Sequence, residues 1–155
     1  MNYERRKKQR GFTLIEILVV IGMIALLAAV VIVAINPGRQ FAQARDAQRM
    51  SNVNTILNAV YQYAVDNRGT LPAGIPVAPA VAGEICRTGA GSCTGLINLS
   101  VLTASEIYLV SLPIDPSCPT GCNVNGTGYT IVQSINGRVT VAAPNDELST
   151  VTVTR

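Results

Sequence analysis

The residues with the clearest chemistry lie close to the amino terminus. Glu16 is embedded in an otherwise apolar stretch, Phe12 to Ile35, directly behind a basic leader, Met1 to Gly11. A carboxylate at membrane depth costs about 2.5 to 3.5 kcal/mol, so it persists where an opposite charge or a polar contact compensates it. Cleavage after Gly11 would create an ammonium group on Phe12, one helical turn before Glu16. We therefore expect this ammonium group to be the partner of the carboxylate.

The segment from Arg10 to Glu16, RGFTLIE, resembles the processing motif of the type IV pilins and of the pseudopilins of type II secretion. The resemblance implies that a prepilin peptidase cuts after Gly11 and that the exposed Phe12 is N-methylated. It implies that Glu16 neutralises the terminal amine of an adjoining subunit as a filament grows, driven by an assembly ATPase and platform machinery. It also implies a pilin fold of the α+β class, in which a long kinked amino-terminal helix packs on a small carboxy-terminal antiparallel sheet.

The apolar stretch is long enough to cross a bilayer. Residues 17 to 35 carry no charged or polar side chain, and a helix from Phe12 would cross about 30 Å of hydrocarbon. The leader holds five basic residues and one acid, which keeps it on the cytoplasmic side and directs the rest of the chain outward. Two alternatives are a secretory signal peptide, whose apolar region is usually shorter, and an anchor that is never cut. Neither alternative explains Gly11, Phe12 and Glu16 together.

The charge balance argues against nucleic-acid binding. The whole chain has a formal charge of +3, but removing the leader leaves seven basic against eight acidic side chains and no lysine. The chain contains no histidine, which removes the commonest general base, and it has no phosphate-binding glycine motif. We therefore expect a structural protein without catalytic residues, without a cofactor and without a nucleic-acid partner.

The helix is expected to continue past the membrane segment and to bend at Asn36-Pro37-Gly38. Beyond the bend, apolar residues at helical spacing form one face, and a glycine at Gly69 ends the helix. We interpret the charged residues of this helix as a solvated face, with a contact between subunits as the alternative. The apolar positions are Phe41, Ala44, Val53, Ile56, Leu57, Val60 and Ala64, and the charged ones are Arg45, Asp46 and Arg49.

The remainder is expected to form a globular head. Residues 70 to 100 show no periodicity and predict a loop, and a short helix is expected near residues 101 to 110. Asn136-Gly137 is a strong hairpin signal between strands at 129–135 and 138–142, and residues 149–154 alternate as a third strand. The predicted organisation is a leader at 1–11, a transmembrane and assembly helix at 12–36, and a head at 37–155. The head comprises a helix at 37–67, a loop at 70–127 and antiparallel strands at 129–154.

The four cysteines, Cys86, Cys93, Cys118 and Cys122, fall in predicted loops outside the cytoplasm, where disulfides are expected. Of the three possible connectivities we favour the two local pairs, Cys86 with Cys93 and Cys118 with Cys122. A zinc site with four thiolates is the alternative, although such sites usually use a tighter C-x2-C spacing.

A calcium site is a second alternative in the same loop region. The major pseudopilins of type II secretion bind calcium in a comparable place, and oxygen atoms are available here on Asp115, Asn123, Asn125 and Thr127. A single acidic residue is too little for a calcium loop, which normally uses several carboxylates, so we predict no metal.

The function that this sequence favours is that of a structural subunit of a type IV pilus-like filament. A pseudopilin of a type II secretion system is the close alternative, and an uncleaved membrane-anchored binding domain is the third. The precursor is expected in the cytoplasmic membrane as a single-pass protein. The filament is expected at the cell surface or in the periplasm.

Processing is predicted after Gly11. Mass spectrometry of the purified subunit should show a chain that begins at methylated Phe12. Replacing Gly11 by a bulky residue should slow this cleavage more than Gly11→Ala does. A purified subunit that still begins at Met1 would contradict the prediction.

Overall fold

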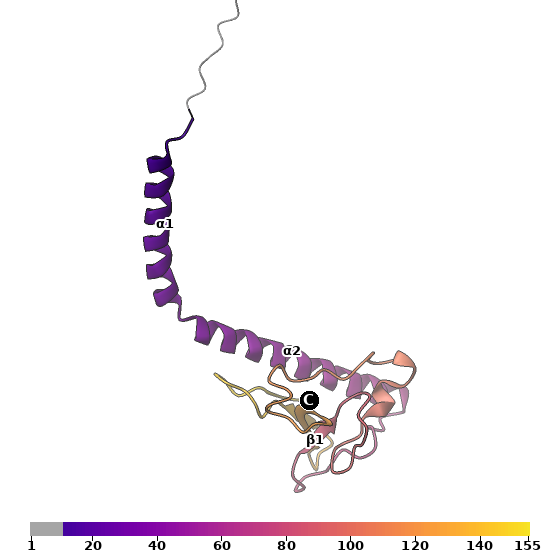
Figure 1. Cartoon of the computed structure of the whole chain (residues 1–155). Coiled ribbons are helices and arrows are strands. Elements are labelled where there is room, and N and C mark those ends of the chain that lie inside the picture. The colour runs from indigo at the N-terminus through magenta and orange to yellow at the C-terminus, as the bar shows by residue number, and fades with distance from the viewer. Residues whose placement is uncertain (1–10) are drawn as a thin grey trace, which may run out of the picture. The chain divides into compact units, whose positions relative to one another are not determined.

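The computed structural model describes residues 11 to 155 and leaves the first ten residues of the predicted leader outside the described part (Figure 1). The chain divides into two compact units, the first ending at Gln40 and the second running from Phe41 to Arg155. Two helices are followed by a small antiparallel sheet of four strands, so the predicted α+β class is confirmed.

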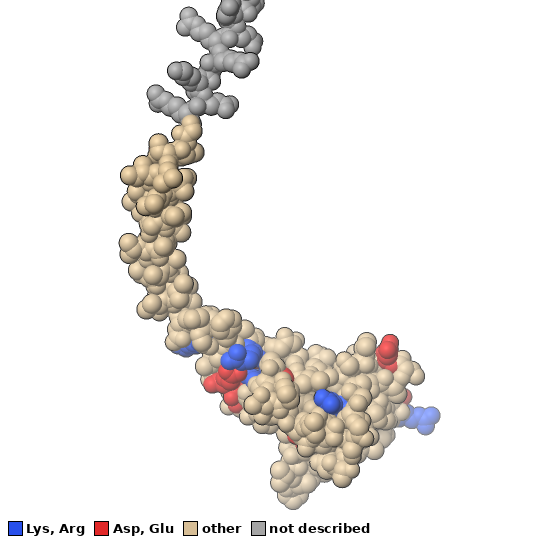
Figure 2. All heavy atoms as spheres, viewed as in Figure 1, with Lys and Arg blue, Asp and Glu red and all other residues tan. Residues whose placement is uncertain are grey.

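Helix α1, Leu14–Ile35, is 22 residues long and none of its residues is buried. It is the one helix among the described residues that is long and apolar enough to cross a membrane. At 1.5 Å per residue it extends about 33 Å, which matches the hydrocarbon core of a bilayer. The face of α1 seen in Figure 2 carries no charged side chain.

The structure divides the predicted kinked helix into two helices at Asn36. Asn36 has a left-handed backbone, with φ of 49°, and ends α1. Pro37 then begins α2, Pro37–Asp66, because proline suits the first position of a helix, where no N–H is needed. The side-chain oxygen of Asn36 accepts a hydrogen bond from the Arg39 N–H at 3.4 Å. One residue therefore ends the first helix and caps the second.

The sheet has the strand order β1-β2-β3-β4, and every neighbouring pair is antiparallel. The strands are β1, Gly83–Cys86; β2, Gly126–Gln133; β3, Val139–Ala142; and β4, Thr152–Thr154. The turn between β2 and β3 contains Gly137 with a φ of 84°, in the hairpin that Asn136-Gly137 indicated.

Two segments differ from the sequence prediction. Strand β1 lies in the stretch that we predicted as a loop. The strand is short, begins with a glycine and pairs with β2 through a register shift between Glu84 and Cys86, so its sequence shows no regular alternation. A side chain at Gly83 would collide with Ile97, whose Cγ1 lies 2.6 Å from the position of an added Cβ. The predicted helix near 101–110 is replaced by two short 3₁₀ turns, Ser100–Leu102 and Ala104–Glu106. The positive φ angles of Ser105 and Glu106 prevent this segment from forming one continuous helix.

Helix α2 supplies one wall of the core of the second unit, and the sheet and loops supply the others. The buried face of α2 begins at Ala42, whereas Phe41 and Ala44 are exposed, contrary to the sequence prediction for these two residues. The core residues are Val53, Ile56, Leu57, Ala59, Val60, Ile75, Ile85, Leu99, Leu102, Leu112, Tyr129, Ile131, Val139, Val141, Ala143 and Val151.

The interpretation of the charged residues of α2 as a solvated face was wrong for Asp46 and Arg49, which are both buried. The Arg49 guanidinium donates to Asp115 through Nε at 2.8 Å, and to Asp46 and Glu147 through Nη1 at 2.8 and 3.0 Å. Its Nη2 donates to the Ser117 hydroxyl at 2.5 Å. Asp46 lies one turn before Arg49, but Asp115 and Glu147 come from distant parts of the chain, so helical spacing could not reveal these two partners. Arg49 thus fastens α2 to two loops of the head.

These contacts also set the ionisation of the acids. Burial would raise the pKa of Asp46, but hydrogen bonds from the Leu148 N–H and the Arg49 guanidinium outweigh burial and hold the pKa below its usual value. Hydrogen bonds from Arg45 and Arg49 lower the pKa of Glu147 to about 2. Because both carboxyl groups have a lower pKa in the fold than in the unfolded chain, their contribution to stability is present at neutral pH. The contribution of Glu147 is lost as the pH falls toward 2.

Arg49→Met is predicted to destabilise the head by about 3 to 5 kcal/mol, because it keeps most of the side-chain volume but leaves buried carboxylates without a partner. The matched control is Arg45→Met, which removes a half-exposed, solvent-screened pair with Glu147 and should therefore cost much less stability than Arg49→Met. Denaturant unfolding of the full chain in detergent, followed by circular dichroism, measures both. Equal losses of stability in the two variants would contradict the central position of Arg49.

Candidate processing and assembly site

The residues of the predicted cleavage site lie outside any helix. Gly11 and Phe12 are exposed, with Phe12 84% exposed, and α1 begins only at Leu14. The peptide bond between Gly11 and Phe12 is therefore available to an enzyme without any helix having to unwind. No heavy atom of residues 11 to 155 lies within 4 Å of the position that a Cβ on Gly11 would occupy. The need for a small residue there would thus arise from the enzyme and not from the substrate's own packing.

Glu16 closes the first turn of α1 together with Thr13. One carboxylate oxygen, Oε2, accepts hydrogen bonds from the Thr13 N–H at 2.9 Å and from the Thr13 hydroxyl at 2.8 Å. The Thr13 hydroxyl oxygen accepts in return from the Glu16 N–H at 3.3 Å. This reciprocal arrangement is a capping box, which satisfies backbone donors that a helix start leaves free.

The sequence analysis had missed the contribution of Thr13. The order Thr-x-x-Glu before an apolar run is the usual sequence pattern of a capping box, so the pattern was available. The other oxygen of Glu16, Oε1, has no hydrogen-bond partner among the described residues. Glu16 can therefore hold the helix start with one oxygen and present the other to a cation.

The four cysteines are brought together in pairs within the head. Disulfides join Cys86 to Cys93, with 5.5 Å between the Cα atoms, and Cys118 to Cys122, with 5.4 Å. These are the two local pairs that the sequence analysis favoured. A zinc site with four thiolates would need the same sulfur atoms in reduced form. The two disulfides and the zinc site are therefore mutually exclusive.

Three of the four side chains considered for calcium have partners within the chain. Asp115 accepts from Arg49, the Asn123 side-chain oxygen accepts from the Asn125 N–H at 2.9 Å, and the Thr127 hydroxyl donates to the Ile85 carbonyl at 3.1 Å. Each of these three side chains is thus engaged by a group of the chain itself.

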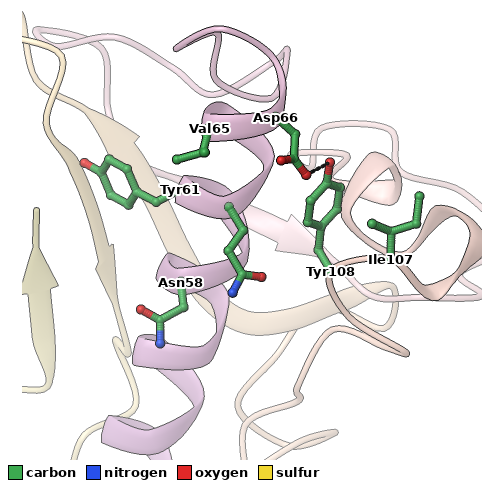
Figure 3. A pocket seen from close by; sticks show the side chains of 7 residues that line it. Asn58, Tyr61, Val65, Asp66, Ile107 and Tyr108 are labelled. Carbon is green, nitrogen blue, oxygen red and sulfur yellow. Dashed lines mark hydrogen bonds between the residues drawn. The ribbon is translucent and has the colours of Figure 1, made fainter.

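A groove over the last turns of α2 also presents polar side chains (Figure 3). The Tyr108 hydroxyl donates to Asp66 Oδ2 at 3.0 Å. Two effects raise the pKa of Tyr108: partial burial, which is the larger, and this hydrogen bond. A tyrosine with a raised pKa stays protonated at neutral pH and is a poor base. The groove is lined by Asn58, Tyr61, Gln62, Val65, Asp66, Ile107 and Tyr108, which do not form a pair of nucleophile and base.

Comparison with known protein families identifies residues 6 to 35 as a prokaryotic N-terminal methylation motif. Comparisons with curated proteins and with solved structures found no match. The matched segment contains Gly11, Phe12 and Glu16 and continues to the end of α1. The chain therefore carries a prepilin motif of the kind found in type IV pilins and pseudopilins. This motif implies processing by a prepilin peptidase and assembly by pilus-type machinery, in a family whose members are structural.

The two disulfides are predicted to be present in the exported chain. Thiol labelling of native, unreduced protein should find no reactive cysteine, and the double replacement of Cys86 and Cys93 by serine should cost about 2 to 3 kcal/mol of stability. Serine at Cys118 and Cys122 is the parallel variant for the second loop. Four reactive thiols in native protein, or zinc that copurifies with it, would contradict the disulfides.

Proposed function

We propose that this chain is the precursor of a structural subunit of a type IV pilus-like filament. The observation that carries the proposal is α1, an apolar helix of 22 residues with no buried residue and with a single charged side chain, Glu16, in its first turn. The proposed precursor has a leader at 1–11, an assembly helix at 12–36 and a head at 37–155. Cleavage between Gly11 and Phe12, followed by methylation of Phe12, yields the subunit.

The exposed apolar surface of α1 supports both stages of this proposal. An isolated water-exposed helix of this composition would be strongly unfavourable, since soluble proteins rarely expose large apolar patches. In the membrane, lipid covers α1, and the leader remains on the cytoplasmic side. After extraction by an assembly ATPase and platform machinery, equivalent helices of other subunits take the place of the lipid. The filament then lies at the cell surface or in the periplasm.

Glu16 has a different partner at each stage. In the precursor, Thr13 supplies the polar contacts to the carboxylate. After cleavage the new ammonium group of Phe12 can approach the free oxygen of the carboxylate within the same chain. In a filament the amine of an incoming subunit offers an intermolecular pair, which the low dielectric of the filament interior strengthens. This pairing favours docking in register.

A pseudopilin of a type II secretion system remains the alternative, because it would use the same helix and motif. Two disulfide-closed loops in the head favour a filament that is exposed outside the cell. The absence of histidine from the sequence agrees with a structural role and not an enzymatic one.

Glu16→Leu is predicted to abolish assembly while leaving the head intact. The variant should insert in the membrane at least as well as the wild type and be cleaved after Gly11, because leucine is cheaper than glutamate at membrane depth. Electron microscopy of cells that make this variant as their only subunit should show no filaments. Glu16→Gln, which keeps the hydrogen bonds but not the charge, should assemble in part, and Ile17→Leu serves as a neutral control. Normal numbers of filaments from Glu16→Leu would refute the charge pairing.

A further inference from the structure

Phe41 is an exposed aromatic side chain at the start of the second unit. Its side chain is 64% exposed, whereas the next residue, Ala42, is only 8% exposed and belongs to the face that packs on the head. Burying a phenylalanine removes a large apolar area from water, so an exposed one calls for an environment that accepts it. The head leaves most of the Phe41 side chain uncovered. The distance of Phe41 from the end of α1 indicates which surroundings can cover it.

Phe41 follows the last residue of α1, Ile35, by six positions. The two steps from Ile35 to Pro37 span about 7 Å at full extension, and the four helical steps from Pro37 to Phe41 add about 6 Å. Phe41 therefore lies at most about 13 Å from Ile35. The limit comes from the chain itself and holds for every orientation of the head. The headgroup layer of a bilayer is about 5 to 8 Å thick on each side of the hydrocarbon. A span that ends at Ile35 therefore keeps Phe41 within or immediately above the headgroups.

The charges around Phe41 suit a phosphate surface. From Pro37 to Arg45, α2 contains two arginines and no acidic residue. Arg39 forms none of the ion pairs found among the described residues, while Arg45, one turn after Phe41, is half-exposed and pairs with Glu147. The first acid of the helix, Asp46, is buried and bound to Arg49. Cations next to an aromatic side chain at the edge of a span are typical of interfacial anchors.

We propose that the first turns of α2, residues 37 to 45, bind the phospholipid headgroup layer on the outer face of the membrane while the subunit awaits assembly. Phe41 inserts its ring at the level of the headgroups, and Arg39 contacts lipid phosphate. This contact holds the base of the head against the membrane and is broken when the subunit is extracted. The inference rests on the membrane-anchored precursor of the proposed function, but not on the filament.

The chain contains no tryptophan, so single tryptophans report on depth without background. Phe41→Trp is compared with Leu27→Trp in the middle of α1 and with Val65→Trp, whose parent side chain is 79% exposed in the last turn of α2. Each full-length variant is reconstituted in vesicles of phosphatidylcholine and phosphatidylglycerol. Emission wavelength and quenching by lipids brominated near the headgroup end of the acyl chain are then recorded.

The expected result is an intermediate depth. The emission of Phe41→Trp should be blue-shifted relative to Val65→Trp, and its quenching by the brominated lipids should exceed that of Val65→Trp. Adding Arg39→Gln should weaken the quenching of Phe41→Trp, and should do so more in vesicles that contain phosphatidylglycerol than in pure phosphatidylcholine, whose phosphate charge is balanced by choline.

Three results would overturn the proposal in distinguishable ways. Quenching of Leu27→Trp with emission of Phe41→Trp equal to that of Val65→Trp would refute the interfacial contact alone. A blue shift of Phe41→Trp that grows with the ratio of protein to lipid, without quenching by brominated lipid, would assign the surface to a second copy of the chain. Failure to quench Leu27→Trp would refute the membrane-anchored precursor itself, and with it this inference.

Discussion

The apolar surface of α1 is the constraint on which the account depends. None of the 22 residues of this helix is buried within the chain, and its one charged side chain lies in the first turn. Such a helix needs a surrounding that the chain does not supply; in the proposed function this surrounding is first lipid and then equivalent helices. The polar groups at its start suit this change of surroundings, since Thr13 satisfies one oxygen of Glu16 and leaves the other available.

The head is fastened to α2 by a different kind of interaction. Arg49 is fully buried and contacts Asp46 on its own helix and the carboxylates of Asp115 and Glu147 on two loops. The disulfide between Cys118 and Cys122 closes the segment that follows Asp115. A buried cation of this kind costs desolvation energy and is stable only when its partners are complete. It gives the head a defined attachment to α2 that apolar packing alone would specify less strictly.

Local patterns in the sequence were enough to predict several elements of the fold. The apolar run and the Asn136-Gly137 turn indicated α1 and the hairpin of β2 and β3, because each depends on neighbouring residues. The buried role of Arg49 could not be predicted, since its partners Asp115 and Glu147 lie 66 and 98 positions away. Strand β1 was missed because its pairing with β2 determines it more than its own short sequence does. At the assembly site, the role of Thr13 was predictable from the capping-box pattern. The surroundings of α1 in a filament could not be predicted in the same way, because they belong to other copies of the chain.

The most direct measurement of the central claim is electron cryomicroscopy of filaments from cells that make this chain. The account predicts residues 14 to 35 as helices packed together in the filament interior, away from solvent, with the amine of Phe12 beside Glu16 of a neighbouring subunit. Filaments in which these helices lie on the outer surface, or in which this segment has been removed from the subunit, would contradict it.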